Sequence, residues 1–427
     1  MGLANFSNNV IFCFLVFLSC FLRGNYCYGE EKSPDCIIIM ISDGCGYETL
    51  KAADLFDGKK QVYEEWEHQW AVSTYPYGGS YSSDLAWTDS SYLDSGYTDS
   101  AAAATALSTG SKTSLGTIGR DSLHQSDYTH LMEKAKAQGF ATGVVTSVEW
   151  SHATPAGFTA HNNSRQNYRE IAREILEGDT DVVMGCGHPE FNNEGKARSP
   201  LGLLGHYRYV GGKKTWDRLN SAYDGYYNNW SLIETLSDFN TLAEGSGPYP
   251  EKVLAIPQVY ETLQYRRRGE ASGGLNQSVP SLATMARGAL NVLSSRDSRF
   301  VLMIEGGAVD WAAHDNKGDR LIEEERAFND AVEEVVSWIE ERSGWDNSLL
   351  IVTADHETGH VGGIGPEGEP GVIFNSKNHT NQLVPLFARG VGAEGFNDYV
   401  VGRDKVRGAY IDNTAVGQYL SSFLSGE

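Results

Sequence analysis

The sequence is poor in cysteine, with six cysteines in 427 residues. Three of them lie in the first 27 residues, a region that we expect to be removed. The other three, Cys36, Cys45 and Cys186, are an odd number at irregular spacing. Small secreted domains that depend on disulfides carry paired cysteines. A disulfide framework is therefore excluded as the basis of this fold.

Positive charge is also scarce. The chain has 34 Lys and Arg against 56 Asp and Glu, so its formal net charge is −22 at pH 7. Nucleic acids and anionic membranes repel so acidic a surface, and we expect neither as a stable partner. The length and the 41% hydrophobic share are enough for a large core, in one big α/β domain or two smaller ones.

Residues 10–22 form an uninterrupted apolar run near the N-terminus. The run is shorter than the ~20 residues that span a bilayer, and its position is typical of a signal-peptide core. We predict a signal peptide at residues 1–29, no membrane span after processing, and a periplasmic or secreted protein. The residues before the run include no Lys or Arg, so a retained anchor or lipidation at Cys20 stay open as alternatives.

Short apolar runs alternate with helical stretches along the rest of the chain. The runs predict buried parallel strands at 36–42, 142–147, 181–184, 300–305 and 349–353. Apolar spacing predicts helices at 130–138, 168–176, 280–293 and 323–342. This alternation predicts an α/β fold, doubly wound, with a mostly parallel central sheet and helices on both faces.

Residues 188–278 differ from their surroundings. They are rich in Gly, Asn, Tyr and Trp and have few periodic runs. We interpret the segment as a long loop-rich insertion that covers a site, with a surface excursion of no function as the alternative.

Asp99 and Ser100 stand directly before a run of alanines that predicts a helix. Free N–H groups at the start of a helix favour an anion, and small side chains leave room beside the serine hydroxyl. A serine hydroxyl is a weak nucleophile unless a base or a metal ion activates it. Ser100 is thus a candidate nucleophile if the chain supplies metal ligands elsewhere.

Metal ligands are available after two of the predicted strands. Asp43 follows the first strand and precedes glycines, a position where α/β proteins bind ligands, although Asp-Gly is also a common turn. Glu305 ends a second strand, and Asp310 and His314 are spaced to share one face of a helix. A helix-capping role for Asp310 is the alternative.

Two further places add imidazoles. Asp355 and His356 follow the strand at 349–353, and at a strand-to-loop junction both can turn toward one cation. His379 stands alone, and a lone histidine is more often simply hydrogen-bonded within a fold. The summed carboxylates and imidazoles are nearly a full set for two zinc ions, and hydroxyl and carboxylate oxygens suit magnesium.

The order of these motifs resembles that of alkaline phosphatases, the metal-dependent phosphomonoesterases. The motifs are Asp-Gly-x-Gly from 43, Asp-Ser-Ala-Ala-x-Ala-Thr from 99, Ala-Thr-Pro-Ala from 153, Glu-Gly with Asp and His at 305–314, Thr-Ala-Asp-His from 353 and His-Thr from 379. The resemblance extends from about Cys36 to about Gly417. It implies that residues 30–427 form a catalytic domain that hydrolyses small phosphate monoesters through a phosphoserine, with two zinc ions and one magnesium ion. It also allows a homodimer.

The resemblance implies roles for individual residues. Ser100 matches the nucleophile, Arg165 the arginine that clamps the phosphate, and Asp99 the acid that orients this arginine. The ligands of one zinc ion match Asp310, His314 and His379. The ligands of the second match Asp43, Asp355 and His356, and those of magnesium match Asp43, Thr154 and Glu305.

Two positions depart from the enterobacterial pattern. His152 and Trp311 stand where that pattern has Asp and Lys, near the third metal and the phosphate. This pair is similar to the marine and cold-active bacterial branch and leaves the identity of the third metal open. A phosphodiesterase or sulfatase of the same superfamily is the alternative function, followed by a metal-binding protein without catalysis.

Overall fold

The computed structural model describes residues 32–221, 227, 229–269, 271–364 and 371–425. The predicted signal peptide, residues 1–29, lies outside the described residues. The chain separates into two units, Met1–Ser33 and Pro34–Glu427, and the second contains all the helices and strands of the described residues. Among the described residues, every helix is too short or too polar to cross a membrane.

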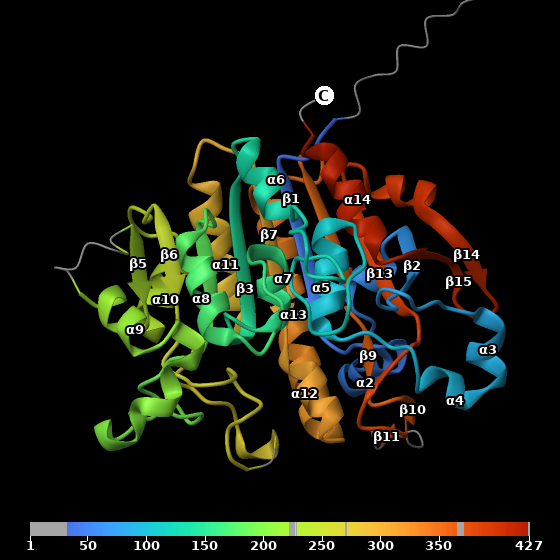
Figure 1. The fold of residues 1–427 in the computed structure, drawn as a ribbon, viewed down its shortest axis with the longest axis horizontal. Coiled ribbons are helices and arrows are strands. Elements are labelled where there is room, and N and C mark those ends of the chain that lie inside the picture. Colours follow the sequence, from blue (N-terminus) through green and yellow to red (C-terminus); the bar gives the residue numbers. More distant parts are fainter. Residues whose placement is uncertain (1–31, 222–226, 228, 270, 365–370, 426–427) are drawn as a thin grey trace, which may run out of the picture. The chain divides into compact units, whose positions relative to one another are not determined.

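An eleven-stranded sheet forms the centre of this unit (Figure 1). Seven adjacent strands run parallel, in the order β8 (Ser348–Thr353), β1 (Cys36–Ser42), β7 (Phe300–Gly306), β3 (Ala141–Glu149), β4 (Val182–Cys186), β6 (Lys252–Ala255) and β5 (Trp230–Ile233). On the far side of β8 follow β13 (Val384–Gly390), β2 (His68–Ser73), β15 (Gly408–Asp412) and β14 (Val400–Asp404). β13 is antiparallel to both β8 and β2. The predicted mostly parallel sheet is confirmed.

The central strands are apolar throughout because both of their faces are covered. All seven residues of β1 are buried, and Ile38 lies in register with Leu302 of β7 and Leu350 of β8. A parallel strand that is covered on both faces needs such a continuous apolar run. All five predicted strands are present, each with ends within two residues of the prediction.

Helices cover both faces of the sheet (Figure 1). α11 (Leu282–Ser294) and α13 (Gly318–Glu341) pack on each other and on β7. α6 (Leu131–Ala137) and α7 (Ala153–Thr159) also contact β3 and β7, and α5 (Ser100–Thr109) and α8 (Tyr168–Glu177) pack on α7. The four predicted helices are confirmed, although α13 begins five residues before its predicted start.

The remaining elements are short. They are α2 (Tyr47–Asp57), η1 (Val62–Glu65), α3 (Ser83–Thr88), α4 (Ser90–Leu93), η3 (Ala271–Gly273), α12 (Ala308–His314), β9 (Glu357–Thr358), β10 (Val361–Ile364), β11 (Val372–Phe374), β12 (His379–Thr380), η4 (Ala393–Tyr399) and α14 (Thr414–Phe423). The cysteines at 36, 45 and 186 are buried and free, as expected without a disulfide framework.

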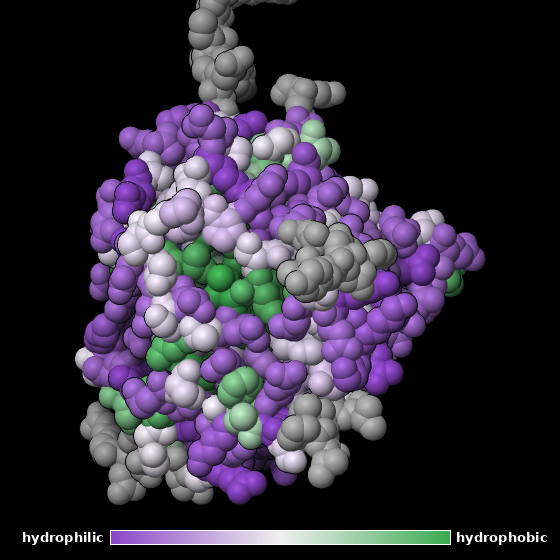
Figure 2. Space-filling model, turned by 90° about the vertical axis from the view of Figure 1, so that its left-hand side faces the viewer, coloured by the Kyte–Doolittle hydropathy of each residue, from purple (hydrophilic) through white to green (hydrophobic). Residues whose placement is uncertain are grey.

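The segment 188–278 contains more regular structure than its composition indicates. It includes η2 (Pro200–Val210), α9 (Lys213–Leu219) and α10 (Leu236–Glu244) and contributes β5 and β6 to the edge of the sheet. Figure 2 shows the side of the molecule where these strands end the sheet: it is hydrophilic over most of its area, with an apolar patch among the polar residues. The interpretation of the segment as an insertion stays a prediction.

Candidate active site

The predicted site residues gather at the carboxyl ends of four neighbouring strands. Asp43 follows β1, Glu305 lies near the end of β7, His152 follows β3 and Asp355 follows β8. Because these strands are parallel and adjacent in the sheet, their ends meet at one edge, where open α/β sheets bind ligands. Residues that are up to 312 positions apart in the sequence are brought together in this way.

Ser100 is the first residue of α5, and Asp99 caps that helix. One Asp99 carboxylate oxygen accepts the N–H groups of Ala102 at 3.1 Å and Gly116 at 3.0 Å. The other accepts Nη1 of Arg165 at 2.9 Å. One carboxylate therefore fixes the start of the helix, the serine and the arginine relative to one another.

A first cluster surrounds the serine hydroxyl. Ser100 Oγ lies 3.3 Å from His356 Nε2 and 3.5 Å from Asp43 Oδ2. His356 Nε2 is in turn 3.5 Å from Asp43 Oδ1 and 3.3 Å from Asp355 Oδ2. All four residues are buried. The ligand atoms of Asp43, Asp355 and His356 lie within 4.8 Å of one another, close enough to share one ion.

A second cluster adjoins the first. Asp310 and His314 lie on one face of α12, as their spacing predicts, and Asp310 Oδ1 is 3.3 Å from His314 Nε2 and 3.4 Å from His379 Nε2. The two Nε2 atoms are 3.0 Å apart. Nδ1 of His314 donates to the backbone carbonyl of Lys377 at 2.5 Å, and Nδ1 of His379 donates to that of Thr98 at 2.7 Å. Both Nε2 atoms therefore lie on the side of the rings that faces Asp310, and this outer bond from Nδ1 is the arrangement of histidines that bind a metal through Nε2.

A third cluster joins Asp43, Glu305 and His152, all buried and within 4.8 Å of one another. Thr146 donates to Glu305 Oε2 at 2.5 Å, and Thr154 lies close enough to lower the pKa of Glu305. The ring of His152 packs edge-on against Trp311, with centroids 5.8 Å apart, and its Nε2 lies 3.4 Å from Arg165 Nη2. His152 thus connects this cluster with the arginine.

Burial and mutual repulsion act on the carboxylates of the first and third clusters. Burial, reinforced by neighbouring carboxylates, raises the pKa of Asp43 well above its usual value, that of Asp355 to about 6 and that of Glu305 to about 7. One oxygen of each has no hydrogen-bond partner among the described residues: Asp43 Oδ1, Asp355 Oδ2 and Glu305 Oε1. Unpartnered buried oxygens are costly. Divalent cations would compensate that cost.

The donor types fit the predicted metals. Imidazole nitrogens mixed with carboxylate oxygens suit zinc, and the oxygens of Asp43, Glu305 and Thr154 suit magnesium. In the second cluster, burial opposes ionisation of Asp310, but the hydrogen bond from His379 and the three nearby imidazoles hold the pKa of Asp310 below its usual range. Asp310 therefore favours its ionised form, the form in which a carboxylate binds a cation.

Two residues that support the clusters were not predicted from the sequence. Thr358 donates to Asp310 Oδ1 at 2.6 Å and lies 3.2 Å from His356 Nδ1, so it links two clusters. Gly44 donates its N–H to Asp355 Oδ1 at 3.1 Å. It has a positive φ of 76°, and a Cβ here would stand 2.9 Å from the Asp310 backbone. The sequence could have indicated Thr358 and Gly44 by position alone, since each lies within two residues of a predicted ligand.

The sequence matches the family model for alkaline phosphatase over residues 35–382. The chain belongs to the alkaline phosphatase family. Among curated relatives, it is 30% identical to alkaline phosphatase 4 of Bacillus subtilis over 282 residues, or 63% of this chain and 51% of that protein. It is 29% identical to the Escherichia coli alkaline phosphatase over 356 residues, or 77% of this chain and 71% of that enzyme. The chain thus spans about half the length of the Bacillus relative.

Solved structures of alkaline phosphatases share this fold. The enzyme of the Antarctic bacterium TAB5 matches with a TM-score of 0.67 at 24% identity, over 92% of this chain and 99% of that one. The cold-active enzyme of a Shewanella species matches with a TM-score of 0.68 at 24% identity, over 91% and 99%. A TAB5 variant with one histidine replaced by aspartate, described with magnesium in a site called M3, has a TM-score of 0.69 at 24% identity, over 92% and 99%.

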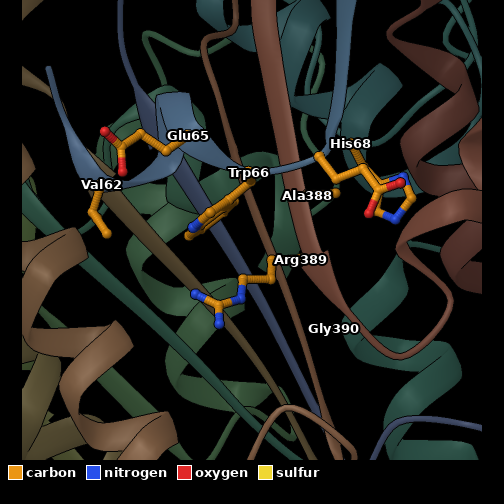
Figure 3. Close-up of a pocket in the computed structure, with 8 residues that line it drawn as sticks. Val62, Glu65, Trp66, His68, Ala388, Arg389 and Gly390 are labelled. Carbon is orange, nitrogen blue, oxygen red and sulfur yellow. The ribbon is translucent and has the colours of Figure 1, made fainter.

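A pocket of about 440 Å³ lies away from this site, near the amino end of β8 (Figure 3). Its lining includes Trp66, His68 and Arg389, and also Gly390, which pairs with Leu349 near the amino end of β8. None of the predicted site residues lines it.

Proposed function

We propose that the protein hydrolyses phosphate monoesters to an alcohol and inorganic phosphate through a phosphoserine on Ser100, with two zinc ions and one magnesium ion. The observation that carries this proposal is the position of Ser100 Oγ. It lies 3.3 Å from His356 and 3.5 Å from Asp43, at the start of a helix whose cap also holds Arg165.

The residues of the chain account for binding and attack. Arg165 donates two parallel N–H bonds to the phosphate oxygens, a task that suits its planar guanidinium. Ser100 Oγ attacks phosphorus in line while the alcohol leaves on the opposite side, and water then attacks the phosphoserine to release phosphate and restore the hydroxyl. When bound, the metal ions supply the Lewis acidity that lowers the pKa of the serine and of water and neutralises the leaving oxygen.

A phosphodiesterase or sulfatase of the same superfamily is the competing function. The third cluster, with Glu305, Thr154 and His152 beside Arg165, supports monoesters, because it adds a cation near the charge of a phosphate with one ester bond. The test compares p-nitrophenyl phosphate, its bis ester and p-nitrophenyl sulfate, with and without a chelator. We expect chelator-sensitive hydrolysis that is fastest for the monoester. Faster cleavage of the diester or the sulfate would contradict the proposal.

Replacement of Arg165 by alanine is expected to weaken inhibition by inorganic phosphate about 10- to 150-fold. A charge-assisted bidentate contact contributes roughly 1.5–3 kcal/mol, and Arg165 is held for such a contact by Asp99 at 2.9 Å. Phosphate inhibition constants and bound metal are measured side by side. The control is Arg403→Ala, an exposed arginine of β14, and an unchanged phosphate affinity in Arg165→Ala would show that Arg165 does not bind phosphate.

The double change His152→Asp with Trp311→Lys is expected to tighten the binding of both phosphate and magnesium. A carboxylate at 152 would order waters on magnesium beside Glu305, and a lysine at 311 would reach phosphate through water. Phosphate inhibition and magnesium activation are titrated in the double variant and in each single variant. If both constants stay within about twofold of wild type, roughly 0.4 kcal/mol, these two residues do not tune the site.

We infer in addition that residues 1–29 are removed on export to the periplasm or the exterior, and that a homodimer is compatible with the family. Sequencing of the mature N-terminus and size determination in solution test these two points.

A further inference from the structure

Two exposed arginines of the 188–278 segment lie over aromatic rings near the site. The Cζ atom of Arg208 is 5.5 Å from the ring centre of Tyr168 and 4.4 Å from that of Tyr209. The Cζ atom of Arg266 is 4.8 Å from the ring centre of Trp311. Both arginines belong to the segment that we predicted to cover a site.

The rings of Tyr168 and Trp311 both pack on His152, which lies beside Arg165, the proposed phosphate-binding arginine. Tyr168 packs nearly parallel to His152, with centroids 6.4 Å apart, and Trp311 packs edge-on against the same histidine at 5.8 Å. His152 Nε2 is 3.4 Å from Arg165 Nη2. Each exposed arginine is therefore one aromatic ring away from His152.

Both guanidinium groups keep donors available for a ligand. Arg208 donates to the hydroxyl of Tyr209, and no carboxylate of the described residues lies within ion-pair distance of it. Arg266 Nη1 is 3.7 Å from Asp315 Oδ2, with both side chains more than 40% exposed, and such a pair contributes little. The neighbouring Arg267 differs, since it is buried and makes two bonds of 2.6 Å to Glu323.

A guanidinium that lies flat on a ring presents its N–H edge to solvent. In a chain with a net charge of −22, a local pair of such cations beside the site concentrates anions that the rest of the surface repels. If this segment only covered the site, aromatic rings would be enough and two cations would not be needed. Among anions, a phosphate group fits two guanidinium groups better than a carboxylate does, because it has more negative charge and more acceptor oxygens.

We propose that Arg208 and Arg266 form a rim that selects phosphate monoesters with a second phosphate group. The cleaved phosphate binds at Ser100 and Arg165, and the second phosphate accepts N–H bonds from the rim. This inference rests on the proposed function, because it assumes that the first phosphate is hydrolysed at Ser100.

The test uses the metal-loaded full chain at low ionic strength. Bisphosphates of linear diols of increasing length are compared with the matching alkyl monophosphates by phosphate release, corrected for the two equivalent phosphates. We expect kcat/KM to favour the bisphosphate by about fivefold at one or more lengths, and added salt to weaken that preference. Arg208→Gln combined with Arg266→Gln should remove most of it.

Arg268→Gln is the matched control, because Arg268 is in the same segment with its side chain 91% exposed, beside Glu194. The control should keep the preference. Equal kcat/KM for both substrate classes at every length, or a preference that the double variant retains, would contradict the proposed role of the rim. Neither result would contradict the proposed hydrolysis of monoesters. Failure of the wild-type protein to hydrolyse p-nitrophenyl phosphate would instead overturn the proposed function, and the rim with it.

Discussion

Ser100→Ala is expected to lower the turnover of p-nitrophenyl phosphate by about a thousandfold or more while both zinc ions stay bound. The hydroxyl is the proposed nucleophile, so its loss removes the covalent route. The three side chains around it, Asp43, Asp355 and His356, remain close to one another without it, and the metal site should therefore survive. Turnover and bound metal are measured on the same preparation.

Ser91→Ala serves as the control, because Ser91 is exposed on α4 in the same part of the chain. Near-normal turnover of Ser100→Ala would remove this serine from the mechanism. Loss of zinc from the variant would instead mean that the hydroxyl is needed to hold the cluster together.

Asp43→Asn is expected to have the second large effect, because Asp43 belongs to both the first and the third cluster. We expect loss of magnesium and of one zinc ion, with turnover lowered by about a thousandfold or more. Metal content is determined on the purified variant beside Asp310→Asn, which should lose the other zinc ion. A full metal complement in Asp43→Asn would contradict the shared-ligand assignment.

The same variant should have opposite effects on stability with and without metal. Burial and the carboxylates of Asp355, Asp310 and Glu305 raise the pKa of Asp43 in the folded protein. Folding then favours the protonated form of Asp43. The contribution of Asp43 to the free energy of unfolding is therefore fully present at low pH and is lost as the pH rises through the raised pKa. In chelator at pH 8, Asp43→Asn should therefore melt at a higher temperature than wild type. With zinc and magnesium present, the order should reverse.

The sequence was sufficient to predict that the candidate metal ligands which follow buried strands lie close together. Asp43, Glu305 and Asp355 lie at the ends of apolar runs, and parallel strands bring such ends together. The spacing of Asp310 and His314 also places both on one helical face before any contact is known. These predictions depend on local pattern and on one topological rule, and the structure brings the side chains together accordingly.

Other features depend on pairing between distant segments, which no local pattern shows. β2 has the mixed sequence His-Gln-Trp-Ala-Val-Ser, and it becomes a sheet strand because β13 and β15 pair with it. Thr358 reaches Asp310 because β9 pairs with β12 and places Thr358 opposite His379. β5 and β6 were missed for a related reason, since each has only four residues.

The carboxylate of Asp99 is hydrogen-bonded to three separate parts of the site. It holds the first turn of α5, the loop at Gly116 and the guanidinium of Arg165. We therefore expect a shift of any of these parts to be transmitted to the others, so that the proposed nucleophile Ser100 and the proposed phosphate clamp Arg165 move together. Arg208 in η2 and Arg266 lie outside this hydrogen-bonded unit, so we expect changes around them to alter the range of esters accepted without changing the proposed line of attack. Variation in substrate range is thereby separated from the alignment of the reacting atoms.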